Sequence, residues 1–192
     1  MLLRAWKEEK FMSRLRVYHR ESPAESHIDT ADGRQIAQHL DRAGVRFERW
    51  QAAAEFAPTA DEATVIDAYR RDVDRLMQGH GYRSVDVVRM LPDNPQKEAM
   101  RAKFLNEHTH SEDEVRFFVE GAGVFYLHIG DDVYTVRCER GDLISVPAET
   151  THWFDMGPQP RFAAIRLFTN ADGWVARFTG TDIAQRFPKF ED

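Results

Sequence analysis

The second half of the chain is a succession of short β-prone runs, and this feature most restricts the folds available to it. From Glu114 onward, runs rich in Val, Ile, Phe and Tyr are separated by Gly, Asp and Pro. Closely spaced strands with such turns are typical of an antiparallel barrel or sandwich. We therefore expect a mainly β fold with flanking helices, whose barrel core covers about residues 104–170. The runs are EVRFFVEG, GVFYLHIG, DDVYTVRCERG, DLISVPA, HWFDMG and RFAAIRLF.

The first half of the chain contains the expected helices, so the barrel is predicted to follow a helical N-terminal half. Residues 32–44 predict a short helix. Residues 58–81 predict a longer one, which has apolar residues at helical spacing and ends at Gly79. Thr59 and Glu62 have the spacing of a capping box at its start. A third helix is expected to extend to about Phe104, with Asn94 as its N-cap and Pro95 in its first turn. Short strands are expected within residues 13–20, 45–50 and 84–91.

Length and composition are those of an ordinary globular protein. The 192 residues suit one domain, residues 1–192, in which 1–12 are an extra or disordered start and Met12 an alternative first residue. The net charge is −6 without a cluster of Lys or Arg, so we expect no nucleic-acid partner. No apolar run approaches the roughly 20 residues of a membrane helix. The one cysteine, Cys138, cannot form an internal disulfide, which favours a reducing compartment, by default the cytoplasm.

The chemistry of the chain is concentrated in two short motifs. The first is H-x-H-x3-E-x6-G, in which His108, His110 and Glu114 can all face one side of an extended segment. The second is G-x5-P-x4-H, which ends in His152. Gly121, Gly141 and Pro147 occupy expected turn positions between and within the motifs. The sequence therefore predicts that three histidines and one glutamate form a metal site inside the barrel.

The four predicted ligands limit which metal ions the site can bind and which further ligands the metal can accept. Nitrogen and oxygen donors without thiolate suit Fe(II), Ni(II), Mn(II), Zn(II) or Cu(II). A structural zinc site is the alternative, but such sites usually contain cysteine and support folds with small cores. In a six-coordinate site, four protein ligands leave room for a bidentate ligand. Three neutral imidazoles and one carboxylate leave a divalent ion with net positive charge, which favours an anionic chelator.

Arg116 follows the glutamate on the same strand and has two possible roles. If Glu114 points into the barrel, Arg116 and Phe118 do so as well, and the residues between them pack outside. A buried charge without a partner costs several kcal/mol. The partner is either Glu114, which makes Arg116 structural, or the negative charge of a bound substrate. Phe154, an even step from His152, would add an apolar wall.

The two motifs resemble the cupin double motif, which implies a double-stranded β-helix, or jelly-roll, barrel. The similarity extends further. DNPQKEAMRAKFLNEHTHSEDEVRFFVEGAG, DLISVPAETTHWFDMG and GVRFERWQA resemble bacterial members of the acireductone dioxygenase family over about residues 14–188. The resemblance implies cleavage of 1,2-dihydroxy-5-(methylthio)pent-1-en-3-one by O₂ in methionine salvage. With Fe(II) the products are 4-methylthio-2-oxobutanoate and formate; with Ni(II) they are 3-methylthiopropanoate, formate and carbon monoxide.

The resemblance also implies roles for particular residues. One Fe(II) or Ni(II) per chain would be held by His108, His110, Glu114 and His152, and Arg116 would hold the substrate dianion. Glu107 and Asp113 fall where the family has residues associated with metal incorporation and conformational coupling. The partners would be small molecules, the acireductone and O₂, and the chain is expected to be a monomer.

Three other classes of protein are compatible with the same motif. A metal-dependent sugar-phosphate isomerase would need more basic residues facing the barrel. A ligand or metal sensor that binds DNA would need a basic helix pair, which is not visible in the sequence. A storage cupin would not need four intact ligands.

Overall fold

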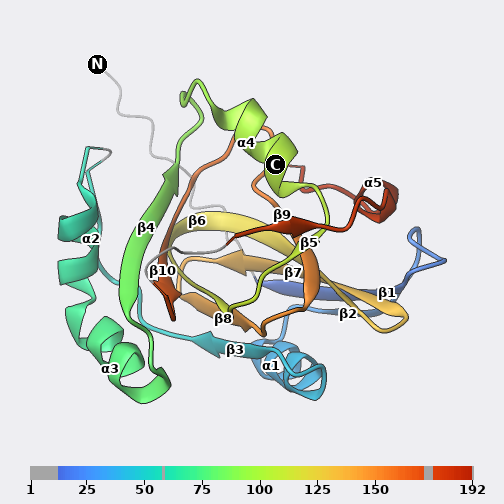
Figure 1. Cartoon of the computed structure of the whole chain (residues 1–192), viewed down its shortest axis with the longest axis horizontal. Helices are drawn as coiled ribbons and strands as arrows, with labels where there is room; N and C mark the ends of the chain where they lie inside the picture. The colour runs from blue at the N-terminus through green and yellow to red at the C-terminus, as the bar shows by residue number, and fades with distance from the viewer. Residues whose placement is uncertain (1–12, 58, 171–174, 192) are drawn as a thin grey trace.

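A computed structural model describes residues 13–57, 59–170 and 175–191 of the chain. Strands dominate it (Figure 1). The expected extra start, residues 1–12 with Met12, lies outside the described residues. The strands are β1 (Arg14–His19), β2 (Ser26–Thr30), β3 (Arg46–Arg49), β4 (Ser84–Met90), β5 (His108–Thr109), β6 (Glu114–Ile129), β7 (Asp132–Glu139), β8 (Asp142–Val146), β9 (Thr151–Asp155), β10 (Phe162–Phe168) and β11 (Arg177–Phe178). The helices are α1 (Gly33–Arg42), α2 (Glu62–Ala68), α3 (Arg70–His80), α4 (Lys97–Phe104) and α5 (Ile183–Arg186).

Strand β6 is the centre of the fold because both halves of it pair on two sides. Its first half pairs with β8 and β10, whose outer neighbours are β3 and β4. Its second half pairs with β7 and β9, which continue through β1 and β2 on one side and through β5 and β11 on the other. All of these pairings are antiparallel. The two sheets enclose the barrel interior, so the expected mainly β architecture is confirmed.

A glycine allows β6 to bend from one sheet into the other. Gly121 has φ +61°, and a Cβ built there would lie 1.7 Å from the carbonyl oxygen of Arg161. Two residues later, a Cβ on Gly123 would lie 2.3 Å from the ring of Phe154. Both positions therefore require the absence of a side chain. The expected strands EVRFFVEG and GVFYLHIG form one continuous strand that bends here.

The sheet that contains the first half of β6, with β8 and β10, has an apolar layer on each face. Inside the barrel, Phe118 packs with Phe125, Phe154 and Phe162. Outside it, alternate residues of β6 pack beneath α2 and α3, which flank β4 in Figure 1. The expected inside and outside residues of β6 are thus confirmed. The outside residues are nevertheless buried, because the helices cover them: Val115, Phe117 and Val119.

The prediction of a helical N-terminal half was wrong. The region before α4 contains four strands, β1 to β4, beside α1, α2 and α3. Three of these strands pair with strands from the second half of the chain: β1 with β7, β3 with β8 and β4 with β10. Strand formation depends on such distant partners more than on local propensity. The N-terminal region therefore builds the outer strands of both sheets.

The expected long helix over residues 58–81 is two helices, separated at Tyr69. This residue has φ −118° and ψ 19°, and its ring is buried edge-on against Phe117 at 5.3 Å. Packing against the sheet thus overrides helical continuity. Asp61, and not Thr59, caps α2. Helix α3 ends at His80, with the left-handed Gly81, and not Gly79, as its C-cap.

The helix expected with Asn94 as its N-cap begins two residues later than predicted, because Gln96 occupies the N-cap position. The Asn94 side chain accepts a hydrogen bond from the backbone of Gln96 within a turn, and α4 starts at Lys97. The sequence pattern also gave no indication of β2, β11 or α5. Of the helices in the described ranges, none combines the length and apolar character needed to cross a membrane.

Candidate metal centre

Two strands bring the motif histidines together. His108 on β5 and His152 on β9 are register partners, so their side chains leave the sheet on the same side. His110 follows two positions after His108, and Glu114 is the first residue of β6. The two sequence motifs thus bring their four potential ligands together.

The four side chains converge on a single point. Their potential ligand atoms all lie within 4.8 Å of one another, and all four side chains are buried. Oε2 of Glu114 lies 3.1 Å from Nε2 of His110 and 3.0 Å from Nε2 of His152. The His108 ring centroid lies 4.5 Å from that of His152 and 4.9 Å from that of His110. A single small cation could contact all four.

Backbone carbonyls fix the orientation of two of these imidazoles. Nδ1 of His108 lies 2.7 Å from the Asn106 oxygen, and Nδ1 of His152 lies 2.7 Å from the Thr150 oxygen. A carbonyl only accepts, so each Nδ1 donates and the Nε2 of a neutral ring carries a lone pair towards the centre. Burial, with His152 nearby, lowers the pKa of His108 to about 4, which keeps this ring neutral near pH 7.

This arrangement fits a metal ion. Nε2 of His152 and Oε2 of Glu114 are both acceptors when the ring is neutral, yet they lie 3.0 Å apart. Two acceptors at this distance are stabilised by a cation between them. Burial alone would raise the pKa of Glu114, but Arg116 and the imidazoles hold it well below its usual range. Glu114 is therefore a carboxylate, and three nitrogens with one oxygen suit a divalent transition metal.

Arg116 touches the same glutamate from the other side. Its Nη2 lies 2.8 Å from Oε1 of Glu114, so the ion pair that the sequence left open as one role for Arg116 is present. The guanidinium carbon also lies 4.5 Å from the ring centroid of Phe154 and 5.1 Å from that of Phe125. Arg116 is only 5% exposed but lines the cavity beside the four donors. It is thus held in place while facing the space that a ligand would enter.

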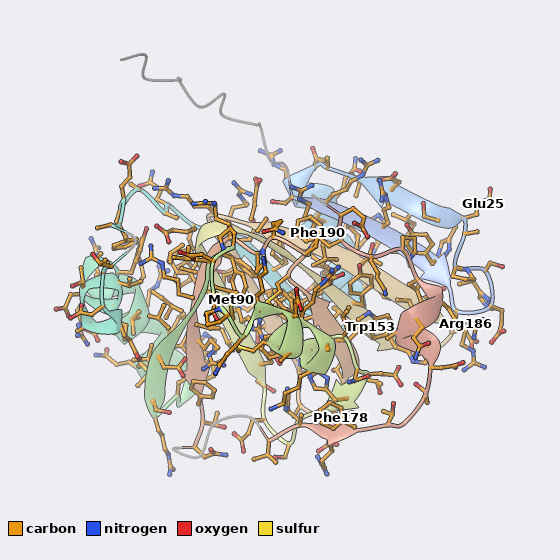
Figure 2. The ribbon with its side chains drawn as sticks, turned by 90° about the horizontal axis from the view of Figure 1, so that it is seen from above. Glu25, Met90, Trp153, Phe178, Arg186 and Phe190 are labelled. Atoms are coloured by element: carbon orange, nitrogen blue, oxygen red, sulfur yellow. The ribbon has the colours of Figure 1, made fainter. Side chains whose placement is uncertain are left out.

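The donors lie at the base of a cavity of about 470 Å³. This volume is in the range of small-molecule sites. Its walls carry several aromatic rings, among them Phe154 as expected. Phe178 is half exposed, and its ring centroid lies 5.8 Å from that of His108. Figure 2 shows Phe178 at the periphery of the molecule, on the β11 segment, whereas Trp153 lies in the interior. The remaining aromatic walls are Phe104 and Phe168.

Glu107 lies beside the centre but faces away from it. Its Oε2 accepts hydrogen bonds of 2.6 Å from the hydroxyls of Thr179 and Thr181, and its Oε1 lies 2.9 Å from Nδ1 of His128. Burial would raise the pKa of Glu107, but these partners lower it below its usual value. Glu107 thus ties the segment after β11 to the strand that carries His108. The sequence indicated neither threonine.

Asp113 also lies outside the four-donor cluster. Its Oδ1 accepts a hydrogen bond of 2.9 Å from the backbone of Ala148, in the connection between β8 and β9. The backbone of Glu149 donates to the His110 oxygen at 2.8 Å. Together these bonds fix the loop after Glu107–His110 against the loop that precedes His152. Asp113 therefore supports the meeting of the two motifs.

Sequence reasoning missed three charged residues of the cavity, namely Lys103 on α4 and an ion pair on two strands. Arg166 on β10 and Asp86 on β4 both line it and form an ion pair. Arg166 belongs to a run, RFAAIRLF, that was recognised only as a strand. Asp86 is a polar residue within the apolar run SVDVVRML, and this is the one local signal that could have indicated it.

Comparison with known proteins identifies the family. Residues 14–176 match the model of the ARD/ARD' family. The chain belongs to this family. An acireductone dioxygenase of Stenotrophomonas maltophilia is 57% identical over 179 residues, which are 93% of this chain and 97% of the relative. One of Xanthomonas campestris is 54% identical over 179 residues, with 93% and 95% covered.

A solved structure supports the architecture of this family member. The acireductone dioxygenase from Bacillus anthracis, with a cadmium ion in its active centre, superimposes with a TM-score of 0.77. The match covers 87% of this chain and 98% of the other, at 27% identity. The family expectation of a metal-dependent enzyme with a cupin barrel is thus confirmed for this chain.

Proposed function

We propose that this family member is an acireductone dioxygenase that cleaves 1,2-dihydroxy-5-(methylthio)pent-1-en-3-one with O₂ in methionine salvage. The observation that carries the proposal is the position of Arg116, within 2.8 Å of Glu114 and beside the four-donor cluster, in a cavity of suitable size. The family match and the named relatives support the same conclusion.

His108, His110, Glu114 and His152 would hold one Fe(II) or Ni(II) per chain. When bound, the metal would supply a Lewis acid that stabilises negative charge on the oxygens of the substrate. The protein keeps its ligands ready for this role. His108 is neutral because it is buried, and His108 and His152 are both oriented by backbone carbonyls.

Arg116 would address the negative charge of the acireductone. An acireductone is an enediol beside a carbonyl, and its ionised form is electron-rich. A fixed guanidinium in a buried site stabilises such charge more than water does, because it needs no reorganisation during the reaction. The rings of Phe125 and Phe154 hold the Arg116 guanidinium and exclude water from it. Arg116 would thus favour the ionised substrate.

The aromatic walls fit the other end of the substrate. The methylthio group is apolar and polarisable, and sulfur makes favourable contacts with aromatic rings. Phe104, Phe168 and Phe178 also line the cavity, and Phe178 is half exposed. The head of the substrate would therefore lie at the metal centre and its tail among the rings.

Glu107 and Asp113 would act as positioning residues. Glu107 holds the β11 segment, with Phe178, against β5 through Thr179 and Thr181. Asp113 holds the loop before β9 through Ala148. Both would affect metal incorporation and the shape of the cavity without contact with the substrate. We further propose that the chain acts as a monomer in the cytoplasm.

The decisive experiment uses a synthetic acireductone. The metal-loaded protein is mixed with it without oxygen, then exposed to O₂, and the loss of the enediol absorbance and the uptake of O₂ are followed. We expect both, with formate as a product. If O₂ is not consumed, the dioxygenase proposal fails and the isomerase alternative gains support.

A further inference from the structure

Three charged side chains form a row across neighbouring strands at the cavity wall. Arg166 on β10 is the register partner of both Arg116 on β6 and Asp86 on β4, and all three line the cavity. Adjacent strands lie about 4.8 Å apart, so the row extends over about 10 Å. Side-chain exposure increases along it, from 7% for Arg116 to 26% for Arg166 and 35% for Asp86. The row therefore leads from the buried metal centre towards solvent.

Asp86 and Arg166 form a bidentate ion pair. Nε of Arg166 lies 2.7 Å from Oδ1 of Asp86, and Nη2 lies 2.5 Å from Oδ2. Such a pair fixes both side chains and directs the guanidinium towards the carboxylate. The Arg166 carbon also lies 5.3 Å from the ring centroid of Phe168. The second arginine of the cavity is thus compensated by a carboxylate of the same wall.

We propose that Asp86 is a specificity-determining residue that restricts this cavity to acireductones with an uncharged tail. This inference rests on the proposed function, which places the head of the substrate at the metal centre beside Arg116. The tail then extends along the row towards Arg166 and Asp86. Because Asp86 compensates Arg166 and is the more exposed member of the pair, a negative tail meets the Asp86 carboxylate and not an uncompensated guanidinium. An apolar tail can lie against the pair.

The effect of Asp86 on a negative tail opposes the effect of Lys103, a positive charge at the same cavity. Lys103 on α4 lines the cavity, is exposed, and would attract a negative tail. An exposed ammonium is hydrated and its field is screened. Asp86 is less exposed and is held in a fixed position by Arg166. Repulsion by Asp86 should therefore outweigh attraction by Lys103. The direction in which salt changes the relative rate with the carboxylate compound shows which of the two charges dominates.

The test compares two acireductones of equal length, one with a methyl end and one with a carboxylate end. For the wild type we expect kcat/KM to be about 10-fold higher for the methyl compound, because like charges near a protein surface repel on this scale. In Asp86→Asn the ratio should shift about 10-fold towards the carboxylate compound, since the Asp86 carboxylate no longer compensates Arg166 or faces the tail. The double variant Asp86→Asn with Arg166→Met should lose that gain.

Asp29→Asn is the matched control. Asp29 forms a bidentate pair with Arg14 at 2.6 Å for both contacts, and its side-chain exposure of 37% is close to that of Asp86. It lies on β2 and does not line the cavity. The control removes the same charge, so it should keep the wild-type ratio. An equal ratio in Asp86→Asn and the wild type would overturn the proposal.

A salt titration of the wild type tests the proposal without any variant. Screening of Asp86 should increase the relative rate with the carboxylate compound as ionic strength rises. A relative decrease would mean that attraction by Lys103 dominates and would also overturn the role of Asp86. Failure of the proposed function gives a different result, because the methyl compound itself would then not be oxidised.

Discussion

His108 and His152 are 44 positions apart in the sequence, yet they are register partners on β5 and β9 with ring centroids 4.5 Å apart. Each ring is oriented by a carbonyl two residues earlier, Asn106 for one and Thr150 for the other. The same local geometry is thus used twice. Because β5 and β9 pair at these two residues, the Nε2 lone pairs of both rings face the same centre.

Replacement of His152, the ligand from the second motif, should weaken metal binding. His152→Ala removes one of four donors and leaves the buried carboxylate of Glu114 with one contact fewer. Loss of even an outer-shell partner commonly costs about 10- to 100-fold in metal affinity, so the loss of a direct ligand should cost at least as much. Metal content of the purified protein, near one per chain for the wild type, should decrease accordingly.

His27→Ala is the control for this experiment. His27 is exposed on β2 and lies 3.8 Å from Asp132, far from the four donors in the sheet order. This variant should keep its metal. If His152→Ala retained full metal content and activity, the four-ligand assignment would be wrong.

Arg116→Ala should keep the metal and lose turnover. The guanidinium contacts Glu114 but is not one of the four donors. Removal of one stabilising donor of this kind commonly reduces the rate about 100- to 1,000-fold. Metal analysis and kcat, measured on the same samples, separate the two roles of Arg116. Loss of metal together with activity would mean that Arg116 mainly supports Glu114, and an unchanged kcat would limit it to the structural ion pair.

The bend of β6 predicts a large difference between two glycines. Gly121→Ala places a Cβ 1.7 Å from the Arg161 oxygen at a φ of +61°, so backbone must move in the strand that carries Glu114. Gly130 has nearly the same φ, +64°, but open space around it. In Gly130→Ala we expect a loss of about 1–2 kcal/mol in the free energy of unfolding. Gly121→Ala should lose about 3 kcal/mol or more. Urea unfolding of both variants provides the comparison, and equal losses would show that β6 relaxes around residue 121.

The local sequence was sufficient for the motif strands and for the donors. His108, His110 and Glu114 are near in sequence, and their spacing determines which side of the chain they share. His152 could be assigned because the second motif also has fixed spacing. The prediction that residues 1–192 form a single domain stays a prediction.

The partners of distant segments could not be predicted from local pattern. The charge row is an example, because Asp86, Arg166 and Arg116 become neighbours only through the register of β4, β10 and β6. The same holds for Glu107, whose threonine partners are more than 70 positions away. Strand pairing between β1 and β7, or between β3 and β8, likewise depends on side chains that meet only in the folded state.

The last prediction concerns the products of one polypeptide with two metals. Protein stripped of metal and reloaded with Fe(II) or Ni(II) should give different cleavage patterns from the same acireductone. Both ions accept histidine and carboxylate ligands, because selectivity among first-row metals depends on geometry and availability more than on donor type. The two ions need not hold the chelated substrate alike. The iron form should release formate and 4-methylthio-2-oxobutanoate, and the nickel form should release formate, carbon monoxide and 3-methylthiopropanoate instead.

The measurement is carbon monoxide in the headspace over samples of verified metal content, under matched O₂. The Arg116→Ala protein loaded with nickel serves as the control, because it should hold the metal but turn over slowly. An active nickel form that releases no carbon monoxide would contradict the two-product prediction and leave the dioxygenase proposal intact. Consumption of O₂ by neither form would contradict both, because the four donors and Arg116 would then serve a different reaction.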